Sequence, residues 1–169
     1  LLDKNFFIEL ITTNTKKTEI KKINNLDYKS YFFSDNKFDA DLVKDLQSSK
    51  KVLISIPPKN NTDLVLKNFG AYFKKKNFDW VTYLSATSVY GDKNGEWVDE
   101  NTYTNPLSSR GKSRLFAENE WLNFYKKFLL QIQIFRLSGI YSNENNIINK
   151  LQKGDYKIIE KKNNFFSRI

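Results

Sequence analysis

The chain has 169 residues, of which 40% are hydrophobic and 15% aromatic, so it can bury the core of one domain and is not expected to be disordered. Its formal net charge of +9 comes from lysines scattered along the whole sequence, an arrangement that argues against nucleic acid as a partner. With no cysteine and no histidine, it lacks disulfides, the commonest zinc ligands and a histidine base, and we predict no bound metal.

Short apolar runs rich in β-branched and aromatic residues alternate along the chain with longer segments of helical period. This rhythm is typical of βαβ units and predicts an α/β fold with a parallel sheet. We predict strands at residues 6–12, 29–34, 52–56, 80–86, 131–137 and 156–160. We predict helices at residues 16–24, 39–48, 62–76, 109–126 and 145–152, with Asn61 or Thr62 capping the third.

The ends of the chain suggest a fragment. There is no methionine, even at position 1, and both ends look as if they were cut inside a fold. No apolar run approaches the length that spans a bilayer and no signal sequence is visible at the start, so we expect a cytoplasmic protein without a membrane partner.

Ligands of open parallel sheets sit at the carboxyl ends of the strands. This rule selects the segments 12–17, 55–58, 85–91 and 137–141 as places for chemistry. It also draws attention to Arg110 and Arg114, which lie one helical turn apart on the same face in a chain that uses lysine for most of its positive charge.

The segment "YLSATSVYGDKNGEWVDENTYTNPLSSRGKSRLFAE" at residues 83–118 resembles the active-site strand, loop and helix of extended short-chain dehydrogenase/reductases, the family of sugar-nucleotide epimerases and dehydratases. "FRLSGIY" at residues 135–141 is similar to the later strand that lines the nicotinamide. The resemblance implies a Rossmann-type, doubly wound parallel sheet, truncated at both ends. Residues 1–169 would form a partial NAD(P)-binding domain, with the first strand, the Gly-rich turn and the C-terminal substrate region absent.

Three family positions are altered in this chain. Where the family has a catalytic Ser or Thr, a Tyr and a Lys, this chain has Ala86, Arg110 and Arg114, which looks like an atypical branch of the family without the Tyr-x-x-x-Lys pair. Arginine only donates and stays protonated, so Arg110 cannot shuttle a proton. Arg114 would contact the cofactor and Arg110 an anionic group. The alternative is an exposed helix face on which Glu118 pairs with Arg114.

The resemblance implies further site residues. Ser85 would take the family's serine position if the alignment slips by one residue, Thr87 is a second hydroxyl, and Asp63 falls where relatives place an active-site Asn. For the hydroxyls the alternative is hydrogen bonding to the turn, and for Asp63 a charge at a helix N-terminus. We predict Tyr90 and Arg168 at the substrate, and cofactor contacts from Thr13, Lys16, Lys17, Ser55, Ile56, Pro57, Arg114, Leu137, Ser138 and Gly139.

NADP is the favoured cofactor, with NAD as the alternative. After the first visible strand, the acidic residue that takes a ribose hydroxyl in NAD enzymes is missing, whereas Lys16 and Lys17 can pair with a 2′-phosphate. We predict an NAD(P)-binding protein that resembles epimerases, dehydratases or oxidoreductases and acts on a small molecule similar to a sugar nucleotide, with an anionic substrate as one option. The alternative is a catalytically silent NADP-binding or redox-sensing protein. A third hypothesis is a basic module associated with nucleic acid.

Overall fold

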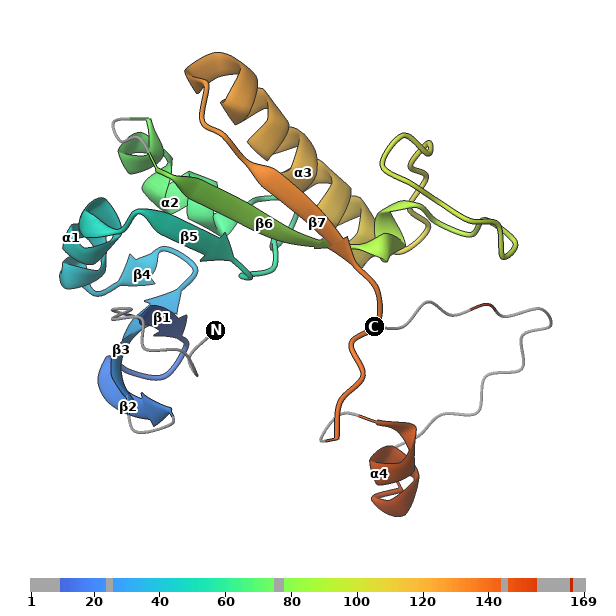
Figure 1. The fold of residues 1–169 in the computed structure, drawn as a ribbon, viewed down its shortest axis with the longest axis horizontal. Helices are drawn as coiled ribbons and strands as arrows, with labels where there is room; N and C mark the ends of the chain where they lie inside the picture. The colour runs from blue at the N-terminus through green and yellow to red at the C-terminus, as the bar shows by residue number, and fades with distance from the viewer. Residues whose placement is uncertain (1–9, 24–25, 75–77, 144–145, 155–164, 166–169) are drawn as a thin grey trace.

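The computed structural model describes residues 10–23, 26–74, 78–143, 146–154 and 165 (Figure 1). Within them, the helices are α1 (Ala40–Ser48), α2 (Leu64–Phe73), α3 (Ser109–Phe128), α4 (Ile147–Gln152) and the short 3₁₀ turn η1 (Thr87–Val89). The strands are β1 (Ile11–Asn14), β2 (Glu19–Ile23), β3 (Leu26–Ser34), β4 (Lys37–Phe38), β5 (Lys51–Ile54), β6 (Trp80–Ala86) and β7 (Gln133–Leu137). No helix in this part of the chain is long and apolar enough to cross a membrane.

The strands form two sheets. In one, β3 lies between β1 and β2 and also pairs with the short β4, and in the other β6 lies between β5 and β7. The pairs β1 with β3, β5 with β6 and β6 with β7 are parallel, as predicted. In the described residues β1 and β5 each pair on one side only. The predicted strand at 156–160 and residues 6–9 of the first predicted strand lie outside the described residues.

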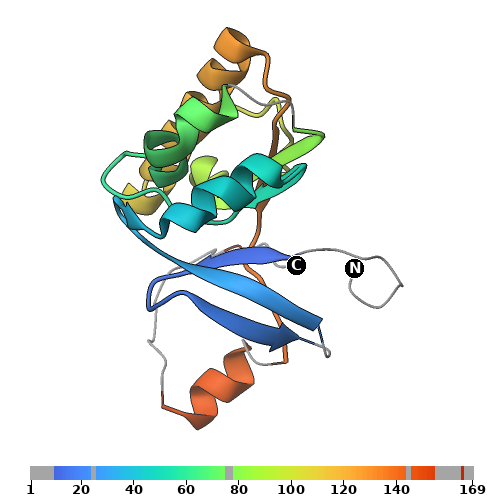
Figure 2. The ribbon, with the colours of Figure 1, turned by 90° about the vertical axis from the view of Figure 1, so that its left-hand side faces the viewer.

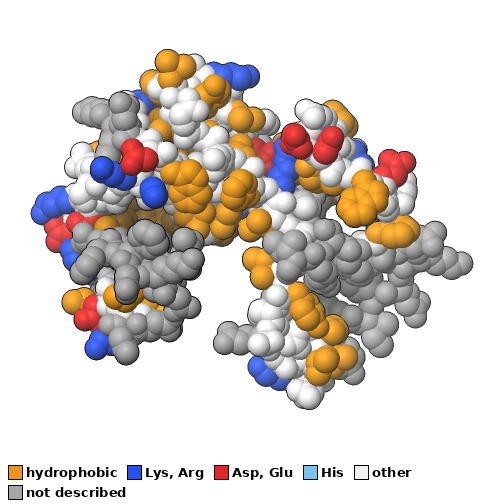
Figure 3. All heavy atoms as spheres, in the orientation of Figure 1, with side chains coloured by type: hydrophobic (Ala, Val, Ile, Leu, Met, Phe, Trp, Pro, Cys, Tyr) orange, Lys and Arg blue, Asp and Glu red, His pale blue; other side chains and the backbone are white. Residues whose placement is uncertain are grey.

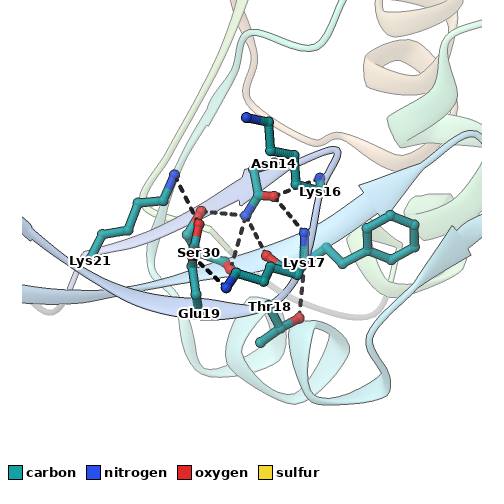
Figure 4. A network of polar contacts seen from close by, with 8 residues as sticks. Asn14, Lys16, Lys17, Thr18, Glu19, Lys21 and Ser30 are labelled. Carbon is teal, nitrogen blue, oxygen red and sulfur yellow. Dashed lines mark hydrogen bonds and ion pairs between the residues drawn. The ribbon is translucent and has the colours of Figure 1, made fainter.

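The helix predicted at residues 16–24 is wrong, because this segment forms β2, which pairs antiparallel with β3. Asn14 makes the turn that starts it (Figure 4). Its side-chain oxygen accepts the N–H groups of Lys16 and Lys17 at 2.8 and 3.0 Å, and its amide donates to the main chain and hydroxyl of Ser30. A side chain that satisfies these N–H groups competes with the helix for them. The segment then completes a hairpin with β3.

Asp63, rather than Asn61 or Thr62, caps α2. Its Oδ1 accepts the N–H groups of Val65 and Leu66 at 2.9 and 2.8 Å. Thr62 is engaged one step earlier, where its main chain exchanges two hydrogen bonds of 3.0 Å with Lys59. Asn60 and Asn61 sit between them with φ of 49° and 52°, values that asparagine tolerates better than most residues.

One hydrophobic core joins the helices to both sheets. Trp121 of α3 is fully buried and packs against Tyr83 of β6 and Phe73 of α2, while Phe69 of α2 contacts Phe33 of β3. Figures 1 and 2 show α2 and α3 on the same face of the β5–β6–β7 sheet. On the opposite face Leu53 and Phe135 remain about half exposed, and hydrophobic side chains gather there in Figure 3.

Candidate functional site

The parallel strands β5, β6 and β7 bring their carboxyl ends to one edge of their sheet. The register sets Ala86 at the end of β6 beside Leu137 at the end of β7. The N-terminus of α3 returns to this edge and touches η1. A Cβ on Gly111 would lie 2.7 Å from the Ser88 carbonyl oxygen and 2.9 Å from Pro106 Cβ, so only glycine permits this approach. Arg110, the residue before Gly111, is thereby held at the carboxyl edge.

The two arginines of α3 have different surroundings. The Arg114 guanidinium donates to the Leu84 carbonyl at 2.6 Å and to the Tyr83 hydroxyl at 3.3 Å, so it fastens α3 to β6. Arg110 is exposed, and no hydrogen bond or ion pair engages it within the described residues. Arg110 is therefore the arginine that is free to meet a ligand, whereas Arg114 already has acceptors. The alternative pair of Arg114 with Glu118 does not form.

Glu118 instead pairs with Arg136, a residue that sequence analysis did not select. Arg136 Nε lies 3.1 and 3.2 Å from the two carboxylate oxygens and a terminal nitrogen lies 2.8 Å from Oε2. Glu118 is 1% exposed, and its hydrogen bonds raise the pKa of Arg136. The guanidinium also lies 4.8 Å from the centre of the Tyr90 ring. An arginine inside a short apolar strand was the available signal for this pair.

Tyr90, a predicted substrate residue, is buried beneath the loop that follows η1. Its hydroxyl donates to the Asp99 carbonyl at 2.8 Å, and its ring stacks on Arg136. Tyr83, its neighbour on β6, is fully buried, and this burial raises its pKa to about 12. Both phenols are therefore bound to the protein itself.

Two buried hydroxyls at the same edge lack a partner. Ser85 near the end of β6 is 4% exposed, and neither its Oγ nor that of Ser138, which follows β7, has a hydrogen-bond partner among the described residues. A buried hydroxyl without a partner costs free energy, so such atoms point to a role outside the fold. Both serines stand among the predicted site residues.

Asp63 is 1% exposed, and both of its oxygens are occupied. Oδ1 caps α2 and Oδ2 accepts the indole N–H of Trp121 at 3.1 Å. Burial raises the pKa of this carboxyl, and the N–H groups that it accepts oppose the rise. The structure thus gives Asp63 the helix-terminal role that was the alternative, and its catalytic role remains a prediction.

The other predicted residues fall into three groups. Thr13, Lys16 and Lys17 lie at the end of β1 in the first sheet, all exposed, and the Lys17 ammonium is 3.7 Å from Glu19. The remaining positions at the edge of the second sheet are Ser55, Ile56 and Pro57 after β5, Thr87 in η1, and Leu137 and Gly139 at the end of β7. Arg168 lies outside the described residues. Among the described residues no cluster of three or more His, Cys, Asp or Glu could hold a metal ion.

Several solved structures are similar to this chain. A functionally unknown conserved protein from Silicibacter pomeroyi is 40% identical with a TM-score of 0.63, over 71% of this chain and 42% of that one. UDP-glucuronic acid 4-epimerase from Bacillus cereus, in complex with NAD, is 26% identical with a TM-score of 0.57, over 68% of this chain and 43% of that one. The chain thus spans less than half the length of either protein.

The fold is also that of dTDP-glucose 4,6-dehydratase from Bacillus anthracis in complex with NAD, which is 17% identical with a TM-score of 0.61, over 86% of this chain and 53% of that one. No protein-family model matches the chain, and no curated protein matches it in sequence. The structural neighbours are NAD-dependent epimerases and dehydratases, so they support the superfamily of short-chain dehydrogenase/reductases and a Rossmann-like α/β fold.

Proposed function

We propose that the chain binds a nicotinamide dinucleotide along the carboxyl edge of its parallel strands, within a protein of the epimerase/dehydratase type. The observation that carries this proposal is the pair of buried, unpartnered hydroxyls, Ser85 and Ser138, at the ends of adjacent parallel strands. Each can both donate and accept a hydrogen bond. The structural neighbours whose complexes contain NAD add support from the fold.

The residues at this edge fit the nicotinamide part of a dinucleotide. Ser85 and Ser138 would hold it, and the bound cofactor would supply hydride transfer. Arg110 stands free at the same edge and would orient an anionic group, such as a phosphate or carboxylate of a sugar-nucleotide-like substrate, through its planar fork of donors. Arg114 supports this arrangement by fixing α3 to β6 through the Leu84 carbonyl.

Removing the two hydroxyls tests the site. Ser85→Ala and Ser138→Ala delete atoms that stabilise nothing in the free protein, so the melting temperature should stay the same or rise. Binding of NADPH or NADH, measured by calorimetry, should weaken by about tenfold for each lost hydrogen bond. Thr82→Val is the matched control, since Thr82 is a buried hydroxyl in the middle of β6 that already bonds Gln133. Unchanged affinity in both serine variants would remove this edge as the cofactor site.

We further propose NADP as the preferred cofactor. Lys16 and Lys17 are exposed at the end of β1, on the turn that Asn14 closes, and both main-chain N–H groups of the turn are already bound, which fixes its shape. Their ammonium groups are the nearest candidates for a 2′-phosphate. The Lys17 ammonium also faces Glu19 at 3.7 Å, so Lys16 carries the larger share of this role.

The double variant Lys16→Ala, Lys17→Ala should weaken NADPH binding by about tenfold, the equivalent of two exposed ion pairs of ~0.7 kcal/mol each. NADH, which has no 2′-phosphate, should bind as before. The preference for NADPH should shrink as salt is raised, because exposed charges are screened. Equal affinity of the unmodified protein for the two dinucleotides would exclude the lysines from the site.

A catalytically silent NADP-binding or redox-sensing protein is the second candidate. It is favoured by Arg114, whose guanidinium is spent on the Leu84 carbonyl and the Tyr83 hydroxyl, and by the arginine at position 110, which cannot transfer a proton. Turnover of NADP(H) with sugar nucleotides separates the two candidates. A protein that binds the dinucleotide but gives no turnover with any of them would support the silent form.

A further inference from the structure

The loop between η1 and α3 differs in charge from the rest of the molecule. Residues 91–105, here called the acidic loop, contain Asp92, Glu96, Asp99 and Glu100 against the single Lys93. The loop therefore carries a net charge of −3 in a chain of net charge +9, which leaves +12 for the remainder. All four carboxylate residues are exposed. Figure 3 shows acidic and hydrophobic side chains side by side on this loop.

The acidic loop is held in one shape. At its neck, the Asn105 N–H donates to the Tyr90 carbonyl at 3.3 Å, and Gly91, with φ of 77°, makes the sharp turn that brings the two ends together. The Tyr90 hydroxyl and Thr102 both bond Asp99 further along, and the bond from Thr102 lowers the pKa of Asp99, which keeps it charged. Compact loops with close ends of this kind are frequently functional.

Two large aromatic side chains stand out from this ordered loop. Trp97 is fully exposed and Tyr103 is 77% exposed. Tryptophan and tyrosine dominate the energetically important positions of protein interfaces, where they fill a pocket on the partner. A rigid loop that presents Trp97 with carboxylates around it needs a groove that is apolar inside and positively charged at its rim.

A groove of that description lies between α2 and α3. It has a volume of about 660 Å³, and its apolar lining includes Leu66, Phe124 and Phe128. Its charged lining is mainly basic, from Lys67, Lys74, Lys127 and the single exposed-side carboxylate of Glu120. The lining in full is Thr62, Asp63, Leu66, Lys67, Gly70, Ala71, Lys74, Glu120, Asn123, Phe124, Lys127 and Phe128.

The lysines of the groove are available. Lys74 and Lys127 lie 4.7 and 5.5 Å from the centre of the Phe128 ring, and along the described chain neither they nor Lys67 forms an ion pair. Glu120 accepts the Asp63 N–H at 3.1 Å and is therefore partly committed to the end of α2. The groove thus offers three cations around an apolar floor.

The acidic loop cannot reach the groove of its own chain. It joins α3 at the N-terminal end of that helix, whereas the groove is lined by Glu120 and the residues that follow it. From Ser109 to Phe124 the helix rises about 22 Å. In Figure 1 the loop projects from the end of β6 away from the C-terminal half of α3.

We propose that the acidic loop of one copy docks into the α2–α3 groove of a second copy, with Trp97 on the apolar floor and the loop carboxylates beside Lys67, Lys74 and Lys127. The two surfaces differ, so the contact is heterologous and each added copy presents a further loop and a further groove. The charges favour this pairing over contact between two like surfaces.

Sedimentation velocity over a range of concentrations tests the proposal. The protein should associate reversibly, and 1 M salt should weaken the association because the Debye length then falls to about 3 Å. Trp97→Ala and the triple variant Lys67→Glu, Lys74→Glu, Lys127→Glu should each weaken it by at least about tenfold. Tyr125→Ala and Lys126→Glu are matched controls, since both residues are exposed on α3 but do not line the groove.

Mixing the two defective variants gives the sharpest test. Trp97→Ala keeps an intact groove and the triple lysine variant keeps an intact loop, so an equimolar mixture should form a one-to-one dimer that grows no further. A protein that stays monomeric at all concentrations would overturn the proposal. So would a dimer that survives Trp97→Ala but is lost in the lysine variant, because that result indicates symmetric pairing of the helices.

Discussion

Glu118→Ala should lower the free energy of unfolding by about 3–5 kcal/mol, the usual cost of removing one partner of a buried ion pair. Glu118 is 1% exposed and meets Arg136 through three nitrogen–oxygen distances of 2.8–3.2 Å. Its loss leaves the guanidinium between α3, β7 and the Tyr90 ring with no anion to balance it. Urea unfolding followed by circular dichroism measures the change.

Two comparisons separate the ion pair from simple loss of packing. Replacing both partners, as Glu118→Leu with Arg136→Leu, should recover most of the lost stability, because no unpaired charge then remains inside. Asp41→Ala removes a partner of Lys44 from an exposed pair and should change stability by less than about 1 kcal/mol. A loss below about 1 kcal/mol for Glu118→Ala would show that water reaches Arg136 and replaces the carboxylate.

The strands of the second sheet could be predicted closely because their local patterns agree with their buried positions. The segment 80–86 is β6 to the residue, and its apolar side chains are flanked by a polar stretch and a turn. The segment 16–24 failed for a nonlocal reason. Its lysines fit a solvated helix as well as an exposed strand, and the choice was made by Asn14, which bonds Ser30 sixteen residues away.

The candidate site was predictable in place but not in partners. The rule that ligands sit at the carboxyl ends of parallel strands led to Ser85 and Ser138, whose hydroxyls are unpartnered. The pair of Glu118 with Arg136 joins a helix to a strand eighteen residues later, and helical spacing pointed instead to Arg114, four residues away. Local spacing does not say which partner lies across the core.

The structure also explains why Arg110 and Arg114, although one turn apart on one face, are not equivalent. The helix meets the sheet at a level where Arg114 stands over Tyr83 and Leu84, with the Arg114 guanidinium 5.8 Å from the centre of the Tyr83 ring. One turn earlier, beside Gly111, the helix has passed the last residue of β6 and contacts η1. Arg110 therefore extends past the end of the strand, and this is the position from which a ligand at the edge can be reached.

Trp121→Ala should cost about 3–5 kcal/mol, because it empties the centre of the core and leaves Asp63 without a buried donor. Trp121 is fully buried between Phe73, Tyr83 and Phe124, and its indole N–H donates to Asp63 Oδ2 at 3.1 Å. Trp121→Phe keeps most of the ring volume and removes the donor, so its cost of about 1–3 kcal/mol isolates the hydrogen bond. Asp63→Asn in the Trp121→Phe background should restore part of that loss, since an asparagine still caps α2 and leaves no unpaired charge. The same substitution in the unmodified protein should restore nothing, because the asparagine N–H₂ group would then face the indole donor. Equal effects of Asp63→Asn in the two backgrounds, measured by urea unfolding, would show that Trp121 and Asp63 act independently and that the indole contributes by packing alone.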